Sequence, residues 1–165
     1  MKQITATLAL LALLLPAIVH ADANKPDDAR ALQGVETGRI LWDVTLGDPA
    51  ALAGRLDVIR ETYDDMLRQG VKPEMVFGFR GGAARLIARS SWHGELDQVS
   101  EITAVHDRLK SLLELGGIHM EACSIATRRI DLGADDLLPG IELVGNTFLS
   151  IMGYQQQGYA TIRID

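Results

Sequence analysis

The fold is decided by the stretch ILWDVTLGDP at residues 40–49. Its first seven residues are mostly apolar and have the length of a strand, and Asp48 followed by Pro49 is typical of a helix N-cap with proline in the first turn. Apolar residues then recur at spacings of three and four until Gly70, as on one face of a helix. These residues are Leu52, Leu56, Ile59, Tyr63, Met66 and Leu67. A buried strand therefore runs directly into an amphipathic helix.

The same alternation continues along the chain. The patterns predict further strands at 75–79, 118–122, 141–144 and 159–164, and helices at 83–89, 96–113, after residue 123 and at 146–157. Strands separated by helices pair in parallel through right-handed crossovers. The sequence thus predicts an α/β protein of the flavodoxin-like kind, with a five-stranded, mostly parallel sheet and helices on both faces. In such folds, sites form beyond the C-terminal ends of the strands.

The N-terminus has the layout of a secretory signal peptide. Lys2 gives a positive start, residues 8–15 are all Leu or Ala, and Val19-His20-Ala21 fits a cleavage site. The apolar run is short for a bilayer core of about 30 Å, and an uncleaved anchor is the alternative. We expect cleavage after Ala21, with Ala23 as the neighbouring option, and a periplasmic protein that has no membrane association after cleavage.

The remaining residues, 22–165, have the usual size of one domain. The net charge of −6 becomes −7 without the leader, which carries Lys2 and no acid. Because no basic stripe or aromatic cluster occurs, we expect no nucleic-acid binding. Residues 22–38 are polar and aperiodic and predict a flexible arm, which leaves residues 39–165 as the domain.

Cys123 is the only cysteine, so no disulfide can form within the chain. It stands where the third strand gives way to a helix. Unpaired N–H groups at a helix N-terminus favour a thiolate, so the position predicts a lowered pKa and a nucleophile suited to sulfur transfer, disulfide exchange or acyl chemistry. An inert, buried cysteine is the alternative. Arg128 and Arg129 follow closely and would strengthen the effect if they point toward the thiol.

Other residues are weaker candidates for contacts to a substrate or anion. The segment GFRGGA at residues 78–83 opens a helix after a strand, so Arg80 and the backbone of Gly81 could hold an anion, although a tight glycine turn explains the segment equally well. His93 could reach the same edge of the sheet and act as a base. Arg128 completes this set. His106 is expected on the solvent side of its helix.

Metal and cofactor sites are not expected. His119 and Cys123 lie four residues apart on a strand, a separation of about 13 Å that is too long for shared ligation of one ion. The turn at residues 47–49 lacks the Ser and Thr of a flavin phosphate loop. The polar residues His119 and Glu121 share one face of a strand that should be apolar, which favours a sheet edge or an interface in a symmetric oligomer.

Three segments carry a resemblance to a known family: LGGIHMEAC at 115–123, DLLPGIELV at 136–144 and QQGYATI at 156–162. The chain from Arg39 onward resembles the DsrE/DsrF-like family, which includes sulfur-relay proteins of the TusD type and YchN-like proteins. The resemblance implies a flavodoxin-like fold, homotrimers or homohexamers, and a persulfide carried on Cys123 between a sulfur donor and an acceptor protein. We therefore expect an exported, sulfurtransferase-type sulfur carrier.

Two other functions remain open on the sequence. The first is a non-catalytic, oligomeric binding or scaffold protein in which Cys123 is structural. The second is disulfide exchange, which is disfavoured because the chain has no second cysteine to resolve a mixed disulfide.

Overall fold

The computed structural model describes residues 25–90 and 98–165. Five strands and four α-helices follow one another in the order β1 (Thr37–Val44), α1 (Pro49–Arg68), β2 (Lys72–Phe79), α2 (Val99–Leu113), β3 (Ile118–Cys123), α3 (Ser124–Thr127), β4 (Ile141–Val144), α4 (Thr147–Gln156) and β5 (Ala160–Ile164). Short 3₁₀ helices, η1 (Gly81–Ile87), η4 (Arg128–Ile130) and η5 (Ala134–Asp136), lie in the connections.

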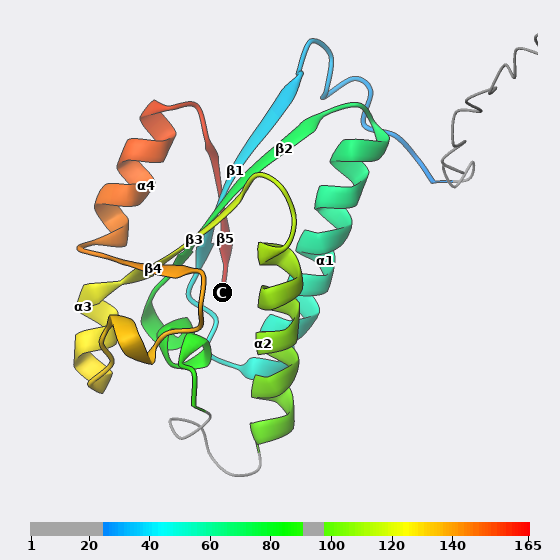
Figure 1. Ribbon diagram of the computed structural model, residues 1–165. Coiled ribbons are helices and arrows are strands. Elements are labelled where there is room, and N and C mark those ends of the chain that lie inside the picture. Colours follow the sequence, from blue (N-terminus) through cyan, green and yellow to red (C-terminus); the bar gives the residue numbers. More distant parts are fainter. Residues whose placement is uncertain (1–24, 91–97) are drawn as a thin grey trace, which may run out of the picture.

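All five strands are parallel and lie in the order β4-β3-β2-β1-β5 (Figure 1). The chain adds β2, β3 and β4 in turn on one side of β1, and then returns through α4 to place β5 on the other side. Right-handed crossovers in opposite directions require helices on opposite faces. Figure 1 accordingly shows α1 and α2 on one face and α4 on the other. The predicted α/β, flavodoxin-like fold is confirmed.

Local sequence explains where α1 begins and ends. The Asp48 side chain accepts a hydrogen bond of 2.7 Å from the N–H of Ala51, and Pro49 occupies the first turn. Gly70 follows the helix with φ of +78°, a backbone conformation that favours glycine. β1 starts at Thr37 rather than at residue 40, because its pairing with β2 continues back to Lys72 beyond the apolar run.

The hydrophobic core lies on the α1/α2 face of the sheet. Alternate residues of β1 and β2, such as Trp42 and Phe77, point into it and pack against Leu56 and Leu109 from the two helices. The opposite face is different, since it buries the carboxylates of Asp43 and Glu121 beneath or beside α4. Thr147 is the only buried residue of α4 itself. One face of the sheet thus supplies the apolar core, and the other carries polar groups.

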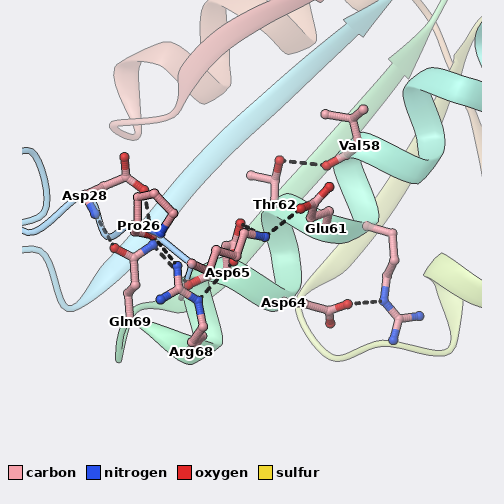
Figure 2. Close-up of polar contacts among 11 residues, drawn as sticks. Pro26, Asp28, Val58, Glu61, Thr62, Asp64, Asp65, Arg68 and Gln69 are labelled. Atoms are coloured by element: carbon pink, nitrogen blue, oxygen red, sulfur yellow. Dashed lines mark hydrogen bonds and ion pairs between the residues drawn. The ribbon is translucent and has the colours of Figure 1, made fainter. Parts of the chain in front are cut away.

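The segment before β1 is bonded to the C-terminal end of α1 (Figure 2). Arg68 Nη2 donates to the carbonyl oxygen of Pro26 at 2.9 Å, and the N–H of Asp28 donates to Gln69 Oε1 at 2.6 Å. Gln69 Nε2 returns a bond of 3.2 Å to the Asp28 carboxylate. The described part of the segment that the sequence predicts as a flexible arm therefore has specific partners on α1.

Two glycines bring the loops after β1 and β2 into direct contact. A Cβ atom on Gly82 would lie 2.9 Å from the Cα of Gly47, closer than side chains tolerate. This contact holds the start of η1 beside the end of β1, next to the cavity described below. Within residues 25–90 and 98–165, no helix has both the length and the apolar character needed to cross a bilayer.

Candidate functional site

Cys123 is the last residue of β3 and the N-cap of α3, as the sequence predicts. It points to the polar face of the sheet, like Glu121 two residues earlier. Its side chain is buried, with 5% of the residue exposed. Cys123 pairs with Val144 on β4, so the chain that leaves β4 passes directly beside the thiol.

Polar groups around the sulfur lower the pKa of Cys123. Burial alone raises the pKa, but the backbone N–H and the hydroxyl of Thr147 and the N–H groups of Ala126 and Ile125 act in the opposite direction. Together these groups favour the thiolate, and the pKa lies below its ordinary value as a result. The groups come from the beginnings of both α3 and α4.

Thr147 places the start of α4 near the thiol. It is fully buried, its hydroxyl has no hydrogen-bond partner among the described residues, and that hydroxyl is one of the groups that lower the pKa of Cys123. The preceding Asn146 caps the helix by accepting a 3.0 Å bond from the N–H of Phe148. The N–H of Thr147 is among the groups that lower the pKa of Cys123.

Arg80 stands beside the thiol in a two-bonded ion pair with Asp43. Its Nε lies 2.7 Å from Asp43 Oδ1 and its Nη2 lies 2.6 Å from Asp43 Oδ2. The guanidinium carbon also lies 4.9 Å from the centre of the Phe148 ring, a cation–π distance. Asp43 raises the pKa of Arg80, and the Cys123 sulfur adds to this at longer range.

A cavity of about 380 Å³ opens onto the sulfur. Its wall includes Cys123, Thr147 and Phe148 together with Arg80, Gly81 and Arg129. No carboxylate belongs to the wall formed by the described residues. A small molecule can therefore reach the thiol through an opening that is apolar at Phe148 and positive at the arginines.

The residues that the sequence predicts as substrate or anion contacts do not all lie at the cavity. Arg80 and Gly81 line the cavity with Cys123, but two of the Arg80 nitrogens are engaged by Asp43. In η4, Arg129 lines the cavity, whereas its neighbour Arg128 does not. His93 lies outside the described residues. The described residues contain no group of three or more His, Cys, Asp or Glu side chains that could hold a metal ion.

The expectation that His106 lies on the solvent side of its helix was wrong, and of the two alternatives for the polar face of the third strand, the sheet edge was wrong. His106 is buried rather than solvent-exposed, because α2 packs against η1 and brings its Nε2 to 3.1 Å from the carbonyl oxygen of Leu86. β3 is an internal strand rather than an edge. One carboxylate oxygen of its polar residue Glu121 has partners within the chain, since the Tyr154 hydroxyl of α4 donates to Oε1 at 2.7 Å and His119 Nε2 lies 3.3 Å from the same oxygen. The other oxygen, Oε2, is buried with no hydrogen-bond partner among the described residues.

Sequence reasoning missed Asp43, Thr147 and Phe148. Asp43 interrupts the apolar run of the first strand, which is a signal for a buried, paired carboxylate. Thr147 and Phe148 follow a predicted N-cap at the end of the fourth strand. Their meeting with Cys123 could be inferred only by knowing that β3 and β4 are neighbours.

Comparisons with known proteins agree with the fold and do not assign a function. No family model matches the chain. It is 21% identical over 124 residues to an uncharacterized protein of Aquifex aeolicus (strain VF5), a match that covers 75% of this chain and 55% of that protein. The chain thus spans about half the length of this curated relative. A solved structure of a protein of unknown function from Methanobacterium thermoautotrophicum is similar with a TM-score of 0.58 and 21% identity, over 77% of this chain and 99% of the other. This likeness shows an α/β fold in common.

Proposed function

We propose that the protein is a sulfur carrier that holds sulfane sulfur as a persulfide on Cys123. The observation that carries this proposal is the position of Cys123 at the end of β3 and the start of α3, beside the cavity, where polar groups of Thr147, Ala126 and Ile125 lower its pKa. A lowered pKa favours a thiolate, which is the nucleophilic form of cysteine. The adjoining cavity gives a donor access to it.

Sulfur transfer from a persulfide needs no external oxidant or reductant. The Cys123 thiolate attacks the terminal sulfur of a donor of the type R–S–SH. A new S–S bond forms on Cys123, the donor's S–S bond breaks, and the donor leaves as the thiolate R–S⁻ with the bonding electron pair. The proton stays on the transferred sulfur. The reverse step, in which an acceptor thiolate attacks the outer sulfur on Cys123, delivers the cargo and restores the thiolate.

The resemblance of the segments around Cys123, Pro139 and Gly158 to DsrE/DsrF-like proteins supports this role. With the leader-like residues 1–21, it also supports an exported, periplasmic carrier. We further propose that the protein forms a homotrimer or homohexamer. The outer face of α4 supports such an assembly, because its large apolar residues Phe148, Leu149 and Met152 are each more than half exposed.

Intact-mass spectrometry tests the carrier role. The native full chain is incubated with inorganic polysulfide, and the expected result is a gain of the mass of one sulfur that dithiothreitol removes. The matched control is Cys123→Ser, which should gain none. A native thiol that takes up no sulfur, when the same chain takes it up after unfolding in urea, would contradict the proposal.

The second candidate function is a non-catalytic, oligomeric binding module. The exposed apolar residues of α4 favour it, as does the burial of Cys123, which a structural cysteine would also show. In that case Cys123→Ser leaves the oligomeric mass unchanged, and wild-type protein gains no sulfur. Light scattering on both variants, beside the mass measurement, separates the two functions.

A further inference from the structure

The cavity at Cys123 has a positive wall. Of its two arginines, Arg80 is bonded to the carboxylate of Asp43, which offsets its charge. Arg129 is exposed, and no carboxylate partner of its side chain is found among the described residues. Because the part of the wall formed by residues 25–90 and 98–165 contains no carboxylate, no side chain in that part balances the charge of Arg129.

The cavity is also narrow at the nucleophile. Only 5% of Cys123 is exposed, although the space above it amounts to about 380 Å³. Apolar side chains, Ile125, Ile130 and Phe148, form much of the remaining wall. This volume is near the lower end of ligand sites, which run from about 300 to 1,000 Å³. A small molecule with a narrow terminal group can therefore reach the sulfur, whereas the apolar wall excludes a bulky disulfide.

We propose that this cavity selects small inorganic anions that carry a sulfane sulfur, of the thiosulfate and polysulfide class, as sulfur donors. The terminal sulfur of the anion lies at Cys123, and its charged end lies against Arg129. This inference rests on the proposed function of Cys123, and it names the donor that the site accepts. Arg129 determines specificity, since it contacts the charged end of the donor and takes no part in breaking the S–S bond.

The transfer step balances for such donors. With thiosulfate, the Cys123 thiolate attacks the outer sulfur, a new S–S bond forms on the cysteine, and the S–S bond of thiosulfate breaks. Sulfite leaves with the bonding electron pair, so the products are the persulfide anion and sulfite. No proton is consumed, and no outside reductant is needed. With tetrasulfide, the leaving group is the shorter polysulfide anion.

A pair of alkylating reagents measures the charge selectivity without any sulfur transfer. Iodoacetate and iodoacetamide have nearly the same size and differ by one negative charge. The ratio of their rates with Cys123 is compared in Arg129→Gln and in the matched control Arg128→Gln, which removes a neighbouring charge outside the cavity wall. We expect the iodoacetate-to-iodoacetamide ratio to fall about fivefold in Arg129→Gln and to stay near that of wild type in Arg128→Gln. Equal ratios in the two variants, or a thiol that reacts with neither reagent, would overturn the inference.

Sulfur donors give the second measurement. Persulfide formation on Cys123 is followed by mass spectrometry with thiosulfate, with tetrasulfide and with an uncharged organic trisulfide. We expect one or both anions to react faster than the trisulfide, and Arg129→Gln to remove that preference. A trisulfide that reacts as fast as both anions overturns the inference while leaving the carrier role intact. If no donor transfers sulfur, the carrier role fails, and the reagent ratio still decides whether the cavity selects anions.

Discussion

Asp43 and Arg80 form an ion pair with two hydrogen bonds, of 2.7 and 2.6 Å, between the middle of the polar sheet face and the end of β2. Asp43 is almost fully buried, and about a fifth of the Arg80 side chain is exposed. The pair fixes the guanidinium under the Phe148 ring and beside the thiol. It therefore connects the packing of the polar face to the shape of the cavity.

Loss of this pair should destabilise the fold. We expect Asp43→Asn to lower the free energy of unfolding by about 2–3 kcal/mol, because it leaves a largely buried guanidinium without its counter-charge. Asp57 is a matched control, since it makes the same two-bonded contact with Arg108 at 2.7 and 2.9 Å on the surface. Asp57→Asn should cost less than about 1 kcal/mol. Urea unfolding of both variants measures the difference, and similar losses would contradict the account.

The pH dependence of alkylation reports the environment of Cys123. Because nearby polar groups lower the pKa of Cys123, the iodoacetamide rate of the native protein should reach half its maximum below about pH 8.5. Thr147→Val keeps the side-chain shape and removes the hydroxyl, so it should move the midpoint upward. Thr161→Val is the control, since the Thr161 hydroxyl bonds to Gln155 instead. A midpoint that does not move in Thr147→Val would show that the hydroxyl does not lower the pKa of Cys123.

His106 should make the protein sensitive to acid. Burial lowers the pKa of His106 in the folded state, whereas the unfolded chain has a value of about 6.5. The unfolded state therefore binds the proton first, and stability is lost as the pH falls below about 6.5, by at most about 1.4 kcal/mol per pH unit. His106→Gln retains a donor for the Leu86 carbonyl without titrating. Urea unfolding at several pH values should show a shallower acid decline for this variant, and parallel curves would rule out His106 as the cause.

The Tyr154 hydroxyl should stabilise the attachment of α4 to the sheet. It donates to the buried carboxylate of Glu121, so Tyr154→Phe should lower the free energy of unfolding by about 1.5–3 kcal/mol. Tyr63→Phe is the matched comparison, because Tyr63 donates to the neutral carbonyl of Gly116 and should cost only about 0.5–1.5 kcal/mol. Thermal and urea unfolding rank the two variants, and the reverse order would contradict the prediction.

The same tyrosine gives an alkaline signature. Burial and the bond to Glu121 raise the pKa of Tyr154 above its ordinary value of about 10. The unfolded state then releases this proton first, and the stability that Tyr154 contributes is lost as the pH rises above about 10. Tyrosinate formation is followed by absorbance between pH 9 and 11. The native protein should ionise one tyrosine fewer in this range than an equimolar mixture of the Tyr154→Phe variant and free tyrosine.

Two glycine substitutions should have opposite signs. Gly82→Ala places a Cβ 2.9 Å from the backbone of Gly47 and should cost about 1–3 kcal/mol of stability. Gly54 lies inside α1 with nothing within 4 Å of an added Cβ, so Gly54→Ala should stabilise by about 0.5–1 kcal/mol. The denaturant midpoints of the two variants, compared with that of wild type, measure both effects. Equal effects would mean that the loop contact is not tight in solution.

The fold was predictable because each strand and helix has its own signal in the chain. The Asp48-Pro49 cap, the apolar spacing of α1 and the turn at Gly70 are local features. The position of Cys123 at a strand end was predictable for the same reason. The remaining site residues were not, because Thr147 meets Cys123 only through the lateral order of the strands. Likewise, the direction of His106 depends on how α2 packs against η1.

The pairing of β5 with β1 has a consequence for the kinetics of folding. It joins residues 40–44 to residues 160–164, so a contact between distant parts of the chain must close before the sheet is complete. Such closures are slow relative to the formation of neighbouring strand–helix units. α4 lies on this late connection and carries Thr147 to Cys123. An intermediate in which only the strands up to β4 have formed therefore lacks the groups of Thr147 that lower the pKa of Cys123. The surroundings of this thiol are completed only when the last strand pairs.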